Sequence, residues 1–204
     1  MLDLEAAGIG DGISEVIVTT KSAAGKPNAA PIGIISESTE EGERRYFVKL
    51  YRGSQTLANV LATGKLAANV TTDAVLFVET AFDDLSAACF TEFAGLPVLA
   101  EANAWIVFTS KLVEERPQYL RVQLCSAAVK INRKEVRAIN RGLNAVIEAT
   151  VLATRLRIVT EKREREVQRK ELERYAAIVA KCGGLRENQA LEILRERLFK
   201  DAPV

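Results

Sequence analysis

The sequence predicts an α+β fold in which about six mostly antiparallel strands come first and a group of helices follows. Segments rich in β-branched residues, separated by short turns, recur over residues 15–131. From about residue 133 the apolar residues repeat with the helical period instead. Strands followed by helices, rather than strands alternating with helices, favour α+β over a doubly wound parallel sheet.

The first two strands are expected at residues 15–20 and 28–36, joined by a glycine turn into a hairpin. Pro31 lies inside the second strand, and because proline cannot donate to the ladder, this strand belongs at an edge or a bulge. Gly33 permits close approach by another group. The small side chains of residues 28–33 suit either a flat wall for a planar ring or an ordinary edge strand protected by its proline.

One inserted helix and four further strands complete the predicted sheet. The helix follows residue 56, because its apolar residues recur at i, i+3 and i+4 and Gly64 fits the position after its last turn. Residues 75–82 fit a helix or a strand, and residues 83–97 are expected as a loop with some local structure. The remaining strands are expected at residues 45–51, 65–71, 104–113 and 119–131.

Two or three helices are expected at the C-terminal end. Residues 161–174 contain 11 charged residues with acid–base pairs four residues apart, which is typical of a solvated helix. Gly183 and Gly184 end this helix, and a last helix carries leucines at helical spacing. We therefore expect a sheet domain at residues 1–132 and, at residues 133–204, a helical extension packed on that domain or on a dimer partner.

Composition limits the classes of partner. The formal net charge is +1, which points to neither nucleic acid nor an anionic membrane. Residues 1–120 carry a net charge of −7 and residues 121–204 a net charge of +8. This asymmetry fits attraction between the two parts, or a basic face for an anionic ligand; the interleaving of Lys and Arg with Glu favours the first. No segment resembles a signal peptide or a membrane span, so we expect a soluble cytoplasmic protein.

The chain has no histidine, which excludes Ser-His-Asp and Cys-His catalysis, His-ligated zinc and a histidine ligand to haem. Its three cysteines have no CxxC spacing, and an odd number does not form a disulfide framework. No metal site is expected, and no side chain is identified as a catalytic acid or base.

The strongest candidate site is Arg52-Gly53-Ser54-Gln55-Thr56. Ser54 is a good N-cap for the helix that follows, and the first turn of a helix offers free N–H groups to a phosphate. Gly53 lets the backbone approach closely, the Ser54 and Thr56 hydroxyls can donate, and Arg52 can form a charge-assisted bond. A serine that merely caps a surface helix accounts for the same residues, because no complete phosphate-loop motif is present.

Two more segments are weaker candidates. Residues 69–73, Asn-Val-Thr-Thr-Asp, are polar at the end of a predicted buried strand, where the edge of a ligand ring could find partners or where the strand simply turns. Asn140, Asn144 and Glu148 recur every four residues along the first C-terminal helix. That face could look into a site or a subunit contact, although a solvated face explains it as well.

Five segments form a pattern through their order and spacing: residues 15–20, 25–33, 51–56, 69–73 and 140–155. Together they resemble an uncharacterised family (a domain of unknown function) of FMN-binding split-barrel proteins. That family is related to pyridoxamine-phosphate oxidases and flavin reductases. The resemblance covers roughly residues 12–160 and implies a homodimer with FMN near the subunit interface. It implies that Arg52, Gly53, Ser54, Gln55 and Thr56 bind the phosphate. It places the flavin ring against Ala30, Pro31 and Ile32, with Asn69 and Thr71 nearby.

The chain departs from the family pattern at two positions. Leu152 stands before Ala-Thr-Arg where the family is expected to have histidine, so any chemistry of that imidazole is lost here. Gln55 stands where a basic residue is expected, which would weaken phosphate binding.

The resemblance implies an FMN-dependent oxidoreductase of unknown substrate and electron donor. Three alternatives remain: a non-catalytic flavin-binding or carrier protein, a split barrel that uses a deazaflavin, and an interaction module with no chromophore. A deazaflavin with an acidic tail would need an enlarged basic surface, which basic residues between 133 and 141 could supply.

Overall fold

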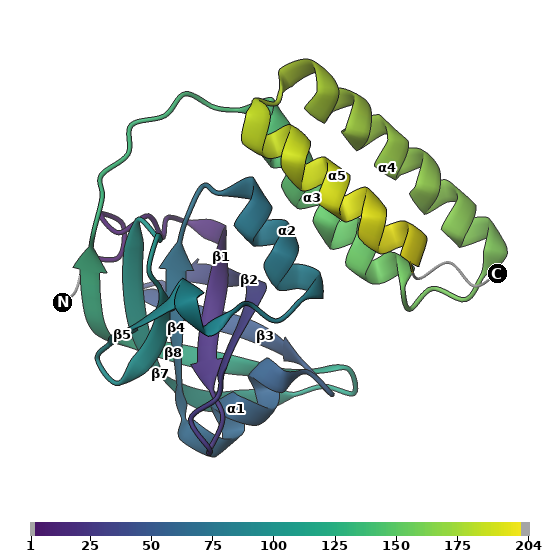
Figure 1. Ribbon diagram of the computed structural model, residues 1–204. Coiled ribbons are helices and arrows are strands. Elements are labelled where there is room, and N and C mark those ends of the chain that lie inside the picture. Colours follow the sequence, from purple (N-terminus) through teal and green to yellow (C-terminus); the bar gives the residue numbers. More distant parts are fainter. Residues whose placement is uncertain (1–2, 201–204) are drawn as a thin grey trace. The chain divides into compact units, whose positions relative to one another are not determined.

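The computed structural model describes residues 3–200 and divides into two compact units. The barrel unit comprises residues up to Thr71 together with Asp84–Glu135. The helical unit comprises Thr72–Asp83 together with the chain from Val136 onward. Figure 1 shows the strands of the first unit and the helices of the second.

Six antiparallel strands close into a barrel in the order β1-β2-β3-β8-β7-β4. This confirms the predicted α+β class and its barrel of about six strands. The predicted strands are found: β8 has the expected bounds, β4 is one residue shorter than expected, and the other four are longer than the sequence indicated. Their bounds are β1 Gly12–Lys21, β2 Pro27–Ser38, β3 Arg44–Tyr51, β4 Lys65–Val70, β7 Ala104–Glu115 and β8 Tyr119–Ile131.

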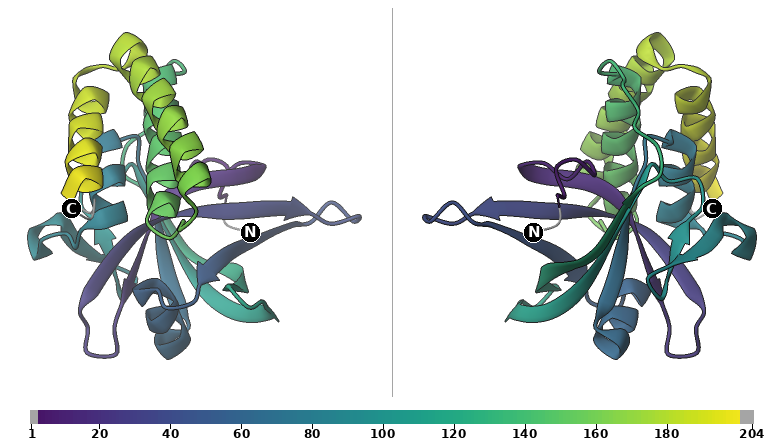
Figure 2. Two further views of the ribbon diagram at one scale, coloured as in Figure 1. Left: turned by 90° about the vertical axis from the view of Figure 1, so that its right-hand side faces the viewer. Right: turned by 90° about the vertical axis from the view of Figure 1, so that its left-hand side faces the viewer.

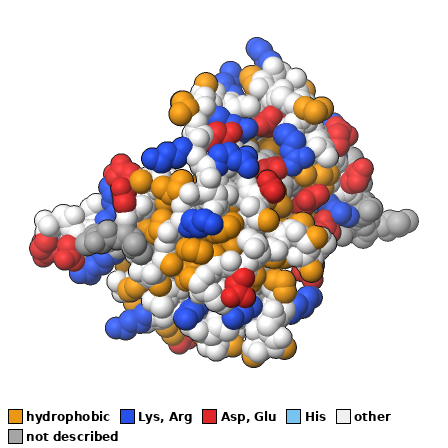
Figure 3. Space-filling view, turned by 60° about the vertical axis from the view of Figure 1, so that its left-hand side comes forward, with side chains coloured by type: hydrophobic (Ala, Val, Ile, Leu, Met, Phe, Trp, Pro, Cys, Tyr) orange, Lys and Arg blue, Asp and Glu red, His pale blue; other side chains and the backbone are white. Residues whose placement is uncertain are grey.

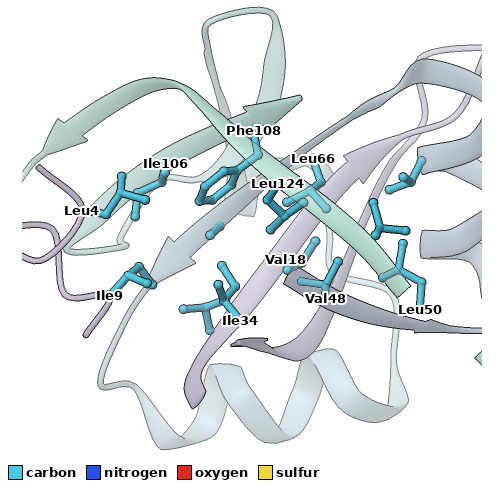
Figure 4. Close-up of a cluster of buried hydrophobic side chains, with 14 of the residues drawn as sticks. Leu4, Ile9, Val18, Ile34, Val48, Leu50, Leu66, Ile106, Phe108 and Leu124 are labelled. Atoms are coloured by element: carbon cyan, nitrogen blue, oxygen red, sulfur yellow. The ribbon is translucent and has the colours of Figure 1, made fainter. Parts of the chain in front are cut away.

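Apolar side chains from every strand of the barrel fill its interior. Figure 4 shows Phe108 lying among aliphatic side chains of the neighbouring strands. Leu4 and Ile9, from the segment before β1, join the same cluster and are almost completely buried. At about 25 cal/mol per Å² of apolar surface removed from water, this interior is the main source of stability for the unit.

The segment between β4 and β7 holds more structure than the sequence indicated. Residues 75–82, open between helix and strand, lie in helix α2, Ala74–Phe82. The expected loop contains a short helical turn and a hairpin of β5, Phe90–Phe93, and β6, Leu96–Leu99. Ala94 and Gly95 turn the hairpin with φ values of 47° and 79°, as a two-residue hairpin turn of positive φ requires.

The barrel is split between β2 and β3. The two strands pair only from Ile35–Phe47 to Ser38–Arg44, while the rest of β3 pairs with β8. Among the described residues, β2 from Pro27 to Ile34 therefore pairs with β1 alone. Helix α1, Gln55–Thr63, contacts β1, β2 and β3 and follows directly after β3.

The helical unit packs α2 with three C-terminal helices: α3 Arg141–Leu156, α4 Lys162–Cys182 and α5 Leu185–Lys200. The boundary expected at residue 132 assigns α2 to the sheet domain, but in the structure α2 belongs to the helical unit. The reason is that Val75 and Val78 are buried against α3 and α5. Ion pairs from Asp73 to Arg186 and from Asp83 to Arg197 also join the two ends of α2 to α5.

Within residues 3–200, no helix has the length and apolar character needed to cross a membrane.

Candidate functional site

The N-terminus of α1 forms a tight turn around Ser54. Ser54 is the N-cap: its Oγ accepts a hydrogen bond from the Leu57 N–H at 3.2 Å and donates to the Tyr51 carbonyl at 2.8 Å. Gly53 has a φ of 82°, a conformation that side chains rarely adopt, and a Cβ there would meet no atom within 4 Å. The backbone conformation therefore requires glycine at this position. Because glycine has no side chain, the space above the turn stays open.

Three backbone donors at this turn are free to bind a ligand. The N–H groups of Gly53, Gln55 and Thr56 have no acceptor within the described part of the chain, since Leu57 and Ala58 are the first residues of the helix to donate to Ser54. Free N–H groups and the positive end of the helix dipole favour an anion at this place. The turn thus has the donors that the anion site expected at residues 52–56 would need.

The side chain of Arg52 is engaged elsewhere in the barrel unit. Its Nη2 pairs with the Glu115 carboxylate at 3.0 Å, and its Nε donates to the Arg116 carbonyl at 3.2 Å. Both partners lie at the turn between β7 and β8. The pair is about half exposed, so breaking it costs little, on the order of 1 kcal/mol or less. Sequence reasoning missed Glu115 because a partner 63 residues away leaves no local signal.

Gln55 and Thr56 connect the helix to the adjacent strands. Thr56 is buried, and its Oγ1 accepts a hydrogen bond from Asn28 Nδ2 at 3.1 Å. Gln55 Nε2 donates to Asn59 Oδ1 at 2.7 Å, and Asn59 Nδ2 donates to Thr20 Oγ1 at 2.9 Å. The Gln55 and Thr56 side chains therefore hold α1 in position, and their backbone N–H groups are the part left for a ligand.

The bond from Asn28 to Thr56 joins the two strongest candidate segments. It places the start of the unpaired edge of β2 beside the first turn of α1. Ala30, Pro31 and Ile32 follow on this edge and are half-buried, opposite Val18, Ile17 and Val16 of β1. The close approach expected at Gly33 is found within the barrel unit: a Cβ there would lie 2.6 Å from the Ile13 side chain, so the glycine makes room for β1.

Asn69 is occupied within the barrel unit. It is completely buried on β4, and its Nδ2 donates to the Ile17 carbonyl at 2.9 Å and to Thr19 Oγ1 at 3.0 Å. Its Oδ1 accepts from the Leu99 N–H at 2.7 Å. The amide thus connects β4 to β1 and β6. Thr71 follows β4 and is half-buried.

The polar positions of the C-terminal helix lie in the helical unit. Asn140 is the N-cap of α3 and accepts from the N–H groups of Gly142 and Leu143. Asn144 and Glu148 are exposed on the same helix, while Leu152 is half-buried there.

Solved structures of proteins named for different activities share the barrel. A flavin reductase domain protein from Arthrobacter matches with a TM-score of 0.51 and 12% identity over 61% of this chain and 80% of its own. A 2-nitrobenzoate 2-nitroreductase from Pseudomonas fluorescens matches with a TM-score of 0.50 and 19% identity over 63% of this chain and 69% of its own. At such identities the likeness establishes the fold class alone.

The chain belongs to the DUF447 family of proteins of unknown function. The model of the family's N-terminal domain matches residues 14–133, and a second model of the same family matches residues 140–196. An FMN-bound protein of this family from Methanosarcina mazei is 40% identical, with a TM-score of 0.86, over 96% of this chain and all of its own. The resemblance inferred from the sequence is thereby confirmed.

Proposed function

We propose that this protein binds FMN, with the phosphate at the N-terminus of α1. The observation that carries the proposal is the FMN-bound relative, which is 40% identical over 96% of the chain. The N–H groups of Gly53, Gln55 and Thr56 supply the donors that a phosphate needs. Arg52 adds a charge-assisted contact by turning from Glu115 to the phosphate, since an exposed ion pair is easily exchanged for a stronger one.

The flavin ring is proposed to lie along the unpaired edge of β2. Ala30, Pro31 and Ile32 are half-buried there, so a ring can bury their remaining surface without moving the strand. Backbone groups on that edge have no partner strand among the described residues and can bond to the polar edge of the ring. In this arrangement Thr71 lies farther along the chain at the end of β4, and Asn69 positions β1 behind the ring.

We also propose that the bound flavin serves an oxidoreductase reaction in a homodimer. FMN supplies hydride or single-electron chemistry, and the protein binds and orients it. On the face drawn in Figure 3, hydrophobic side chains reach the surface between charged ones. In the barrel unit, Tyr51 and Leu61 are more than half exposed, and Leu112 and Val113 are about 40% exposed, which leaves apolar surface for a second copy to cover.

The phosphate site is tested by introducing a negative charge without removing the helix cap. Aspartate and asparagine cap helices as well as serine does, and both lack the hydroxyl that donates to the Tyr51 carbonyl, so Ser54→Asp and Ser54→Asn should have similar folding midpoints. Ser54→Asp should weaken FMN binding at least tenfold through charge repulsion, while riboflavin, which has no phosphate, binds as in the parent protein. Titration calorimetry measures both ligands on all three proteins. Equal loss of FMN and riboflavin, or no loss of either, contradicts the assignment.

Activity and assembly are tested on the FMN-loaded protein. Turnover of NADH or NADPH with oxygen, quinones and nitroaromatics as acceptors supports the oxidoreductase proposal. No turnover with any pair, in a protein that binds FMN, favours the carrier alternative instead. Light scattering should give about twice the chain mass of 22.3 kDa if the dimer is correct.

A further inference from the structure

The helical unit contains a cavity of about 700 Å³ between α3, α4 and α5. This volume is in the usual range for small-molecule sites, roughly 300–1,000 Å³. Its walls are mainly alanine and leucine side chains, and all residues that line it belong to the helical unit. The lining residues are Ala149, Leu156, Arg157, Arg165, Arg169, Leu172, Glu173, Ala176, Ala177, Ala180, Leu191, Leu194, Arg195 and Leu198, which together define the helical groove.

The groove exists because α4 and α5 diverge from a very short connection. Only Gly183 and Gly184 separate the two helices, and Figure 2 shows them joined at one end and spread apart toward the other. At the joined end the backbone is tightly packed, since a Cβ on Gly142 would lie 2.4 Å from the Gly183 Cα. Helix α3 forms the floor through Ala149 and Leu156. The groove is therefore closed at the glycine turn and open at the far end.

Charge is concentrated at the open end. Helices α3 and α5 both run antiparallel to α4, so the C-terminal ends of α3 and α5 lie beside the N-terminal half of α4. This brings together four arginines of the lining: Arg157, Arg165, Arg169 and Arg195. Toward the glycine turn, the lining residues are Ala149, Ala180 and Leu191. The groove thus has an apolar end and a cationic end.

Two of the four arginines have their charge available. Arg195 pairs with Glu192 at 2.8 Å, and Arg157 lies 4.6 Å from the centre of the Phe82 ring. Arg165 and Arg169 form no ion pair with another side chain that the structure describes. Glu173 is the one acid in the lining, so the lining residues carry a formal charge of +3, of which the Arg195 charge is compensated by Glu192 outside the lining.

We infer that the helical groove binds a single-chain amphiphile with an anionic head, namely a long-chain carboxylate. The apolar end would bury the chain, and Arg165 and Arg169 would bind the carboxylate through charge-assisted hydrogen bonds. A second copy of this chain fits less well, because a two-fold contact through the groove would bring the same arginine cluster against itself. The inference concerns only the helical unit and does not depend on the proposed FMN site.

The inference is tested with dodecanoate on the full-length protein. Calorimetry should show one dodecanoate bound per chain, with dodecyltrimethylammonium and dodecanol binding at least tenfold more weakly. Two double variants distinguish the effect of charge in the groove lining from the effect of the overall charge of the protein. Arg165→Gln with Arg169→Gln should weaken dodecanoate binding at least tenfold. Lys162→Gln with Arg163→Gln removes the same charge from residues outside the groove lining and should change binding by less than twofold.

A second variant tests the apolar end independently. Ala177 is exposed and lines the groove, so Ala177→Phe fills it without disturbing a buried position and should abolish dodecanoate binding at an unchanged folding midpoint. Absence of dodecanoate binding, equal binding of the cationic amphiphile, or equal effects of the two double variants would overturn the inference. A shift of the dimer to monomer in Ala177→Phe, without any dodecanoate binding to the parent, would show that a second copy occupies the groove.

Discussion

At the residue scale, the turn before α1 combines a constrained backbone conformation with the donors proposed to bind phosphate. Gly53 supplies a positive φ, Ser54 caps the helix, and Thr56 fixes the turn to β2 through Asn28. The sequence signalled Ser54 and Gly53 because capping and positive φ depend on neighbouring residues. No local pattern indicated the ion pair between Arg52 and Glu115, because this pair forms only when β3 lies beside β8.

Replacing Gly53 tests whether this turn is a binding site. Gly53→Ala forces alanine into a left-handed conformation at a cost of about 1–2 kcal/mol and turns the backbone N–H groups. Gly42 is a matched control because its φ is 79° and a Cβ there also meets open space, but it lies between β2 and β3. We expect both variants to lose similar unfolding free energy in urea, and only Gly53→Ala to lose FMN affinity. Equal FMN affinity in the two variants would contradict the site.

At the element scale, close helix contacts decide the geometry of the helical unit. The start of α3 crosses the turn between α4 and α5 so closely that Gly142 has no room for a side chain, and a Cβ on Gly183 would lie 2.7 Å from the Val179 carbonyl oxygen of α4. Glu187, in the first turn of α5, accepts a hydrogen bond from the Gly184 N–H at 2.8 Å and fixes the turn further. The sequence marks these glycines as helix ends, but the crossing itself depends on the packing of three helices.

Because of this crossing, replacing Gly142 by alanine should change the stability of the protein in the direction opposite to the one that helix propensity predicts. Alanine favours a helix over glycine by about 1 kcal/mol, yet Gly142→Ala should destabilise the protein by roughly 2 kcal/mol or more because the Gly183 backbone must move. Asn144→Ala, at an exposed position of the same helix, should instead be neutral or slightly stabilising. Urea unfolding followed by far-ultraviolet circular dichroism measures both. A stabilised Gly142→Ala protein would refute the crossing.

Tyr175 on α4 gives the helical unit a dependence on alkaline pH. Its pKa is raised by partial burial and by the nearby negative charges of Glu148 and Glu171. The folded state therefore holds the phenolic proton more tightly than the unfolded state does. Stability from this group is fully present below the unfolded pKa of about 10 and is lost as pH rises through the folded pKa.

Tyr175→Phe removes this titration. The parent protein should lose more unfolding free energy between pH 8 and pH 11 than the variant, when both are measured in urea at each pH. Because all other titrating groups are common to the two proteins, the difference reports Tyr175. Parallel losses in the two proteins would show that the phenol does not contribute.

At the scale of the whole molecule, the two units carry different kinds of proposed site. The barrel unit holds the turn before α1 and the free edge of β2, and the helical unit holds the helical groove. The sequence showed this contrast only as charge, with a net −7 in residues 1–120 and a net +8 thereafter. The structure shows that part of the basic excess gathers at one end of a groove.

The single tryptophan reports the barrel unit alone. Trp105 is buried on β7, and its Nε1 donates to the Leu99 carbonyl at 2.8 Å within the same unit. FMN at one hundred times its dissociation constant should stabilise this unit by about 2.7 kcal/mol and raise the tryptophan fluorescence midpoint. Ser54→Asp should show a much smaller rise at the same FMN concentration. A rise of equal size in the variant would place FMN elsewhere.

The sequence by itself determined the features that depend on neighbouring residues. The β-branched runs, the Ser54 cap, the glycine turns and the charged helix each follow from local backbone and side-chain preferences, so the α+β class and the candidate turn could be predicted. Short elements were missed: β5 and β6 have four residues each, and a proline in β6 weakens the strand signal. The place of α2 was also missed, because its packing partners lie far along the chain.

Only the tertiary structure decided which candidate residues act together. It brought Asn28 to Thr56, assigned Asn69 to connections within the barrel, and gathered arginines from three helices at one end of the helical groove. These relations depend on strand register and helix crossing, which are set by burying the apolar faces of segments distant in sequence. Local sequence patterns therefore determined the secondary-structure elements and the turn proposed to bind an anion. The burial of those elements against one another determined which residues lie beside that turn.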